Sequence, residues 1–450
     1  MGYRPLLSAT GWGAAGPAAS APVSMSLTPS PTPSPSSASA SPGPDAVGAG
    51  LIDFPPAATP GPVPGKVPLA ARINGAAVKG IGTTSGYVVD ATTGQVLHAS
   101  RATTPLIPAS TMKVLTSLAV LDSVEPGTTF DTRVVTAAPG QIILVGGGDP
   151  YLTAKPDTSY PRAQSATRLA ALTAAALKAS GTTRVSLGYD DTLFTGPDWH
   201  PTWPTRYFGN VVPIHALSLD GGRDAKGALS RTPHAAAATT FSALLTAQGI
   251  TVTGKPGARK APAGATELAR VSSLPVEILV QEALVHSDNV ATEMLLRHLA
   301  LADHQPPSFV GGHAALVERL TALKVWHPLA TVVDGSGLSR SNLVPATMLG
   351  SAIRVATTTP RLSGLLEGLP VAGVSGTLSS RYFDDTALPG RGRVHAKTGT
   401  LTKVSTLAGY TTTKDGRVLV FAFMSNNATN EWGVRVWLDK VTGALTSCGC

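Results

Sequence analysis

Two β-hairpin patterns, at opposite ends of the sequence that follows residue 65, limit the folds that this chain can adopt. Near the N-terminal end, apolar residues between 86 and 98 flank the turn sequence Ala91-Thr-Thr-Gly94. Near the C-terminal end, residues 406–423 repeat the pattern around Lys414-Asp-Gly-Arg417. The sequence between them includes long helical stretches. We therefore predict one sheet that is built from both halves of the chain.

Helical periodicity marks three segments next to these hairpins. Pro108-Ala-Ser110 opens an apolar pattern that continues to Leu121, and Trp432–Leu445 predicts a helix that closes the chain. The segment Pro275–Ala302 is also helical, although the pattern is interrupted near Ser287. The predicted fold class is α/β, of the α+β type.

A change of pattern indicates an inserted domain. Between residues 132 and 264, short β-like runs alternate with Gly- and Pro-rich turns and with one Ala-rich helix, Ala163–Ser180. We interpret residues 132–264 as an inserted α+β accessory domain. Residues 66–131 and 265–450 would then form the main domain, which the insertion interrupts.

The N-terminal residues 1–65 have a different composition from the rest of the chain. Residues 16–65 are mostly Ala, Pro, Ser, Thr and Gly, and they bury too little apolar area to offset the entropy lost on ordering. We predict a disordered linker here. Residues 1–23 make a poor signal peptide, because Arg4 is their only basic residue and Gly and Pro interrupt the apolar run. Either export uses an unusual signal or the true start lies upstream of Met1.

Charge and composition exclude some classes of function. The 450 residues carry a formal net charge of +8, which favours binding to an anionic partner such as nucleic acid, a membrane surface or a cell wall. No cluster of five basic residues and no basic–aromatic pattern is present, so nucleic-acid binding is not expected. No apolar run reaches about 18 residues, which excludes a multi-spanning membrane protein. The two cysteines, Cys448 and Cys450, exclude a cysteine-ligated metal site in the body of the chain, and their pairing stays open.

The first candidate catalytic motif is Ser110-Thr-Met-Lys113, at a predicted helix N-terminus. Residues three apart share a helix face, so the lysine amine can reach the serine hydroxyl. Serine becomes a useful nucleophile when a base removes its proton, and lysine is such a base when burial lowers its pKa. The alternative is a helix-capping serine followed by a surface lysine.

The second motif is Ser287-Asp288-Asn289, within the helical segment. A polar triplet at this place suits a cleft, where Ser287 would relay a proton and Asn289 would hold a substrate amide. The alternative is a joint between two helices with Ser287 as the cap.

The third motif is Lys397-Thr398-Gly399-Thr400, just before the C-terminal hairpin. Gly399 on an edge strand would let a ligand backbone approach closely, and the hydroxyls and the lysine could bind a carboxylate. The alternative is the ordinary start of a strand.

The three motifs in this order carry more weight than any one of them. Ser-x-x-Lys, Ser-Asp-Asn and Lys-Thr-Gly together are typical of penicillin-binding proteins and class A β-lactamases. The chain resembles the class C low-molecular-mass penicillin-binding proteins of the actinobacterial type, which are D-alanyl-D-alanine carboxypeptidases/endopeptidases. In that family a second module separates the first two motifs, as it does here between Ser110 and Ser287.

The resemblance covers about residues 73–450. Further matching segments are Leu144-Val-Gly-Gly-Gly-Asp-Pro150, Asp334-Gly-Ser-Gly-Leu-Ser-Arg340, Gly373-Val-Ser-Gly-Thr377 and the ending Cys448-Gly-Cys450.

The resemblance implies a fold and a reaction. The main domain would be a transpeptidase-like domain with an antiparallel sheet flanked by helices. Ser110 would attack the penultimate D-Ala carbonyl of a peptidoglycan stem peptide, with Lys113 as the base. Ser287 and Lys397 would protonate the leaving D-Ala, and Asn289 would orient the acylated peptide.

The resemblance also implies substrate-binding residues. Backbone N–H groups of Ser110 and Thr400 would form the oxyanion hole, and Thr398 and Thr400 would bind the terminal carboxylate beside Gly399. Arg340 would border the substrate side chain. The remaining members of the predicted substrate-binding set are Ser336 and Phe208.

One segment departs from the family pattern. Members that act on a free side-chain amine often carry an acid a few residues before an aromatic. The corresponding stretch here, Trp203-Pro-Thr-Arg-Tyr-Phe208, has Arg206 instead, and Asp198 is the nearest acid upstream. We expect an amidated, acetylated or crosslinked side chain in the substrate.

The remaining expectations concern partners, place and alternatives. The reaction needs no metal or cofactor, and no His-Glu-x-x-His motif is present to bind one. The partners would be stem peptides and, as inhibitors, β-lactams that acylate Ser110. An enzyme of this kind would be exported and would lie peripheral to the membrane or cell wall. One alternative is a β-lactamase, but this sequence has no glutamate in an obvious place to activate the water for deacylation. The other alternative is an inactive wall-binding module, which the intact motifs disfavour.

Overall fold

The computed structural model describes residues 61–158 and 163–449. Residues 1–23, most of the predicted linker and Cys450 lie outside the described residues. Within the described part, no helix combines the length and the apolar character needed to cross a bilayer.

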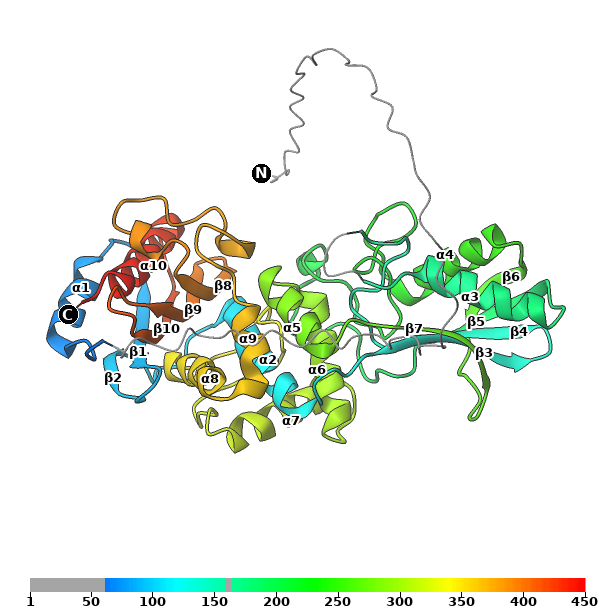
Figure 1. Cartoon of the computed structure of the whole chain (residues 1–450), viewed down its shortest axis with the longest axis horizontal. Coiled ribbons are helices and arrows are strands. Elements are labelled where there is room, and N and C mark those ends of the chain that lie inside the picture. Colours follow the sequence, from blue (N-terminus) through cyan, green and yellow to red (C-terminus); the bar gives the residue numbers. More distant parts are fainter. Residues whose placement is uncertain (1–60, 159–162, 450) are drawn as a thin grey trace, which may run out of the picture. The chain divides into compact units, whose positions relative to one another are not determined.

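The first sheet confirms the prediction from the two hairpins. Its order is β2-β1-β10-β9-β8, and every neighbouring pair is antiparallel. Strand β1 pairs with β10, for example Val88 opposite Phe421, so the two halves of the chain meet in the middle of the sheet (Figure 1). The strands are β1 (Thr83–Asp90), β2 (Val96–Ser100), β8 (Val394–Leu401), β9 (Val404–Thr412) and β10 (Val418–Asn426).

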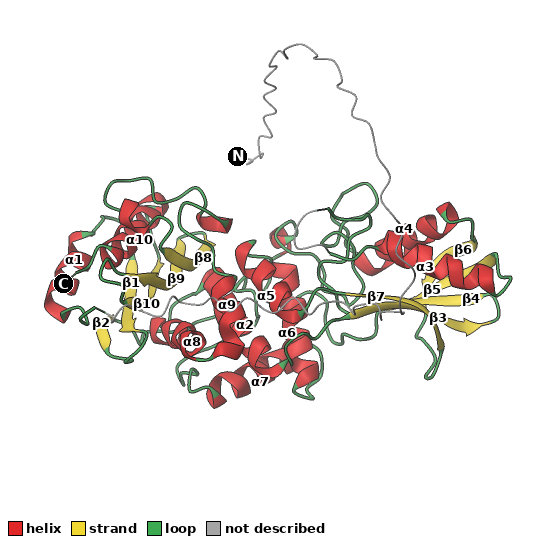
Figure 2. Cartoon of the chain, in the orientation of Figure 1, coloured by secondary structure: helices red, strands yellow, loops and turns green. Residues whose placement is uncertain are grey.

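Helices pack on both faces of this sheet, because alternate strand residues point to opposite sides. Leu407 and Phe421 belong to one hydrophobic cluster, which includes residues of α1 (Lys66–Gly75) and α10 (Glu431–Thr446). Ala408 and Val420 belong to another, larger cluster. The helices of that larger cluster are α2 (Met112–Ser123), α5 (Val276–Val285), α6 (Asn289–Ala302), α7 (Phe309–Ala322), α8 (Ala346–Thr358) and α9 (Ser363–Glu367). The predicted α+β class, with an antiparallel sheet flanked by helices, is confirmed (Figure 2).

Two of the predicted helices differ from the structure in detail. The pattern that begins at Pro108 starts as a short 3₁₀ turn over Ala109–Thr111, and α2 follows at Met112. The predicted interruption near Ser287 separates α5 from α6, because Ser287 adopts a positive φ of 56° that an α-helix does not allow. Ser110 and Ser287 therefore both lie just before an α-helix and not within one.

A second sheet occupies the middle of the sequence. Its order is β6-β5-β4-β3-β7; the pairs β4/β5 and β5/β6 are parallel, and the pairs of β3 with β4 and β7 are antiparallel. Helices α3 (Ala166–Ala179) and α4 (Pro233–Ala247) pack on it around buried Leu169 and Phe241. The strands are β3 (Asp131–Ala138), β4 (Gln141–Val145), β5 (Arg184–Asp190), β6 (Thr251–Ala258) and β7 (Thr266–Ser272).

Candidate active site

The 3₁₀ turn that carries Ser110 is fastened to the first sheet. The hydroxyls of Thr111 and Thr406 both donate to the carbonyl of Pro108, each at 2.7 Å. Ala109 adopts a positive φ of 47°, which is unfavourable for a residue with a Cβ and needs surrounding contacts to hold it. The half-buried Ser110 is thereby presented on a fixed turn between α2 and the sheet.

Lys113 lies one helical turn beyond Ser110, and its side chain is completely buried. Its Nζ is 3.4 Å from Ser110 Oγ, and it donates to Asn289 Oδ1 and to the carbonyl of Ser336, each at 2.7 Å. The structure thus joins the first two motifs through one amine. The contact to Ser110 is the longest of the three, so it is the weakest of the three hydrogen bonds that Lys113 makes.

Burial lowers the pKa of Lys113 to about 8, although the carboxylates of Glu293, Asp288 and Asp334 oppose the shift. Taking a charged amine out of water disfavours the ammonium form more than these acids restore it. At neutral pH roughly one amine in ten is therefore neutral and able to accept a proton.

Lys397 joins the second and third motifs in the same way. Its Nζ donates to Ser287 Oγ and to the carbonyl of Thr398, both at 2.9 Å, and its side chain is buried. Burial, and then the nearby charge of Lys113, hold the pKa of Lys397 well below its usual value. The charge of Lys113 thus disfavours the charged form of the Lys397 amine.

Asn289 connects the site to the loop that contains Phe208. The Asn289 Nδ2 donates to the carbonyl of Asn210 at 2.8 Å, while its Oδ1 accepts from Lys113. Phe208 is half-buried two residues earlier, and the guanidinium of Arg231 lies 4.3 Å from its ring centroid. The asparagine is therefore held at both ends of its amide.

Strand β8 brings the third motif against the serine turn. A Cβ at position 399 would lie 2.1 Å from Thr406 Oγ1 and 2.6 Å from the carbonyl of Pro108. Glycine is thus required because the strand meets the turn that carries Ser110, and this reason is additional to the expected approach of a ligand. Thr398 and the exposed Thr400 alternate with Gly399, and the hydroxyl of Thr398 lies 2.8 Å from that of Thr377.

The two predicted residues of the 334–340 segment lie in different surroundings. Ser336 is fully buried, and its backbone contacts the site, since its carbonyl accepts from Lys113. Arg340 is exposed and donates to the carbonyl of Thr402 at 3.1 Å, beside the turn that follows β8.

Glu293 is a site residue that the sequence analysis did not identify. It is fully buried, and its Oε1 accepts from the backbone N–H of Ser336 at 2.7 Å. Burial, and then the nearby Asp334, raise the pKa of Glu293 to about 7. Its position four residues after Asn289 places both on one face of α6, which is the signal that could have identified it.

Asp198, the nearest acid upstream of the 203–208 stretch, lies beside a histidine. Asp198 Oδ2 lies 3.2 Å from His215 Nε2, and Arg206 is exposed. Trp203 is buried and donates from Nε1 to Asp334 at 2.7 Å, so this stretch is tied to the 334–340 segment.

Comparisons with known proteins agree on one family. The profile of the D-Ala-D-Ala carboxypeptidase 3 (S13) family matches residues 69–230 and 223–436. A carboxypeptidase of Mycobacterium tuberculosis is 36% identical over 82% of this chain and 81% of its own length. The carboxypeptidase DacB of Mycolicibacterium smegmatis is 35% identical over 82% of each chain. Penicillin-binding protein 4 of Haemophilus influenzae has a similar fold, with a TM-score of 0.69 at 22% identity, over 82% of this chain and 97% of that chain.

Proposed function

The chain belongs to the D-Ala-D-Ala carboxypeptidase 3 (S13) family, so it is a serine-type D-alanyl-D-alanine carboxypeptidase, and we propose that Ser110, Lys113, Ser287, Asn289 and Lys397 are its catalytic residues. The observation that supports the assignment is that the Lys113 amine contacts both Ser110 Oγ and Asn289 Oδ1. A β-lactamase and an inactive wall-binding module are not favoured by the comparisons.

In the proposed acylation step, Ser110 Oγ attacks the penultimate D-Ala carbonyl of a stem peptide, and the neutral amine of Lys113 accepts the hydroxyl proton. Backbone N–H groups of Ser110 and Thr400 stabilise the negative charge that develops on the carbonyl oxygen. The lowered pKa of Lys113 supports this role, because an amine that is always protonated cannot act as a base.

In the proposed release step, the C–N bond breaks and the leaving D-Ala nitrogen takes a proton from Ser287 Oγ. The 2.9 Å contact with Lys397 supports Ser287 and Lys397 as the pair that passes on to the leaving nitrogen the proton that Lys113 took from Ser110. Thr398, Thr400 and Gly399 on β8 bind the terminal carboxylate, and water then hydrolyses the Ser110 ester. Asn289, held between Lys113 and Asn210, orients the peptide.

Covalent labelling with a fluorescent penicillin tests the catalytic assignment. Ser110→Ala removes the acylated hydroxyl, so we expect no label and no adduct in the intact mass. Lys113→Ala removes the base, so we expect acylation slower by orders of magnitude in a variant that still folds. Labelling at a normal rate in either folded variant would contradict the assignment.

We also propose which stem peptides the enzyme uses. No acid precedes Tyr207 and Phe208 in the 203–208 stretch, and Asp198 is engaged by His215. These observations support a substrate whose side-chain amine is amidated, acetylated or crosslinked. Turnover of amidated and free-amine stem peptides distinguishes the cases, and a strong preference for the free amine would refute the proposal.

Mass spectrometry of products from purified peptidoglycan separates release of D-Ala from cleavage of crosslinks.

The remaining proposals concern organisation and place. An enzyme that acts on peptidoglycan meets its substrate outside the cytoplasm, and we propose that it is exported and peripheral to the membrane or wall. The separate sheet and hydrophobic cluster in the middle of the chain support an accessory domain, expected over residues 132–264. The sheet itself begins with β3 at Asp131 and includes β7 (Thr266–Ser272), so the domain extends beyond both of these bounds. Penicillin-binding protein 4 of H. influenzae binds a β-lactam, which supports β-lactams as inhibitors here, with Ser336, Arg340 and Phe208 bordering the bound molecule.

A further inference from the structure

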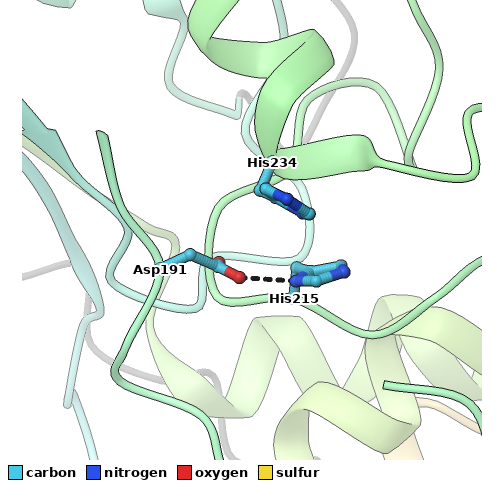
Figure 3. A group of neighbouring side chains, drawn as sticks. All are labelled: Asp191, His215 and His234. Atoms are coloured by element: carbon cyan, nitrogen blue, oxygen red, sulfur yellow. Dashed lines mark hydrogen bonds and ion pairs between the residues drawn. The ribbon is translucent and has the colours of Figure 1, made fainter. Parts of the chain in front are cut away.

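Three side chains that are distant in sequence meet in the middle segment, away from the three motifs. Asp191 follows β5, His215 lies in the loop beyond Trp203, and His234 is the second residue of α4 (Figure 3). One potential ligand atom of each residue lies within 4.8 Å of those of the other two. We propose that Asp191, His215 and His234 bind one divalent transition-metal ion such as zinc.

Unsatisfied imidazole nitrogens support this site. His234 Nδ1 is buried, and it has no hydrogen-bond partner among the described residues. The His215 and His234 rings lie 4.0 Å apart between centroids, inclined by 47°. A buried nitrogen without a partner costs free energy, and a metal ion would use its lone pair. Buried His234 Nδ1 thus offers a ligand atom whose need the described residues leave unmet.

Distances around His215 assign a role to each of its nitrogens. Nδ1 lies 2.5 Å from Asp191 Oδ2, whereas two ligands of a tetrahedral zinc ion are about 3.3 Å apart. If Asp191 Oδ2 and His215 Nδ1 moved apart by less than about 1 Å, the ion could therefore bind between them. On the other side of the ring, Nε2 faces Asp198 Oδ2 at 3.2 Å. The two atoms form no hydrogen bond in the described structure, but a carboxylate at this place can orient a metal-binding histidine from its second nitrogen.

The ligand set selects the class of ion. Two imidazoles with one carboxylate suit zinc and its first-row neighbours, whereas magnesium and calcium prefer oxygen ligands. Asp191 borders two hollows of the surface, one of about 340 Å³ shared with Asp198 and His215 and one of about 580 Å³ shared with His234. An ion can therefore enter from solvent, and three protein ligands leave a position for water.

The site would fasten three parts of the middle segment to one another. It would join the end of β5, the 197–219 loop and the start of α4. The same loop supplies the Asn210 carbonyl that holds Asn289 and the Pro197 carbonyl that accepts from Arg297. The ion would thus act as a structural clip whose loop also contacts the candidate active site.

Zinc titration of the metal-depleted full chain tests the proposal. By calorimetry we expect about one zinc ion per chain in the wild type and an affinity at least a hundredfold lower in His234→Ala and His215→Gln. Asp198→Asn removes only the orienting carboxylate, so a loss of about 10- to 100-fold is expected. Cobalt(II), whose visible absorption reports its coordination, provides a second probe of the same variants. His304→Asn, at an exposed histidine, is the matched control and should bind like the wild type.

A second measurement separates lost binding from lost folding. Variants are compared only if penicillin still labels Ser110, and zinc should raise the Tm of the wild type and of His304→Asn but not of His234→Ala or His215→Gln. Absence of zinc binding in the wild type would overturn the proposal. Equal binding by folded His234→Ala and His215→Gln would overturn it as well, because the ion would then lie elsewhere.

Discussion

At the scale of single residues, the chemistry of the site depends on what burial does to two side chains. Lys113 is deprived of water and keeps only an amide oxygen, a carbonyl and a hydroxyl as partners. Glu293, which is also buried, is connected to it through the backbone of Ser336, whose N–H donates to Glu293 and whose carbonyl accepts from Lys113. The lowered pKa of the amine and the raised pKa of the acid both follow from the loss of hydration.

The pKa of Lys113 predicts how acylation depends on pH. The neutral amine is the active form, so its fraction grows as pH rises towards the value of about 8. We expect kcat/KM to rise about tenfold per pH unit below that value and to level off above it. Initial rates on a D-Ala-D-Ala peptide from about pH 6 to pH 9 measure this, with Tm over the same range as the control for folding. A flat profile below pH 8 would exclude Lys113 as the base.

Glu293→Gln tests the coupling between the acid and the amine. The amide oxygen still accepts from Ser336 N–H, but the negative charge that raises the Lys113 pKa is gone. We expect the midpoint of the pH profile to move to lower pH with little change in the maximum. Glu293→Ala should instead lower the free energy of unfolding by about 1–3 kcal/mol, because a buried N–H loses its acceptor. An unmoved midpoint in the Gln variant would count against the coupling.

At the scale of secondary-structure elements, the site depends on how closely β8 and the serine turn approach. Gly399 meets Thr406 and the Pro108 carbonyl, and Gly337 meets the Ala109 carbonyl, where an added Cβ would lie only 1.9 Å away. Two glycines therefore let three elements meet around Ser110. The helix break at Ser287 places the second motif opposite them, through Lys397.

Gly399→Ala should separate these elements. The added methyl must push β8 or the backbone at Pro108 by a fraction of an ångström or more, and a misplacement of about 1 Å costs about 100-fold in rate. We expect the penicillin acylation rate to fall by roughly that factor. Gly257→Ala in β6, where a Cβ meets nothing within 4 Å, is the control and should label normally. Equal rates in both variants would show that the approach does not position Ser110.

At the scale of the whole molecule, one buried ion pair joins the two halves of the chain. Asp90 ends β1, and Arg417 lies in the hairpin before β10; the guanidinium donates to both carboxylate oxygens. Burial raises the pKa of Asp90, but the bonds from Arg417 and Thr93 outweigh it and leave the pKa below its usual value. The pair closes the sheet between segments that are more than 300 residues apart.

Asp90→Asn should therefore destabilise the chain strongly. It leaves the buried guanidinium without its counter-charge, which costs about 3–5 kcal/mol when one partner of a buried pair is removed. Urea unfolding measures the change in free energy. The control is Arg270→Ala, which breaks an exposed pair with Asp131 and Glu267 and should cost less than about 1 kcal/mol. Similar losses in the two variants would refute the special role of the Asp90–Arg417 pair.

The sequence by itself determined the elements and the contacts that lie within one turn of chain. The hairpins around 91–94 and 414–417 follow from alternation and turn residues, and the break near Ser287 follows from an interrupted helical period. Ser110 and Lys113 meet because they are three residues apart at the start of a helix. Such features depend on neighbours in the chain, so periodicity is enough to predict them.

Only the tertiary structure decided which distant groups meet. Nothing in the local pattern indicated that the Ser336 carbonyl would accept from Lys113, or that the Pro108 turn would require glycine at position 399. Likewise Asp191, His215 and His234 have no characteristic spacing and come together through a strand end, a loop and a helix start. The physical reason is that burial and long-range packing set these contacts, and neither is encoded in the period of any one segment.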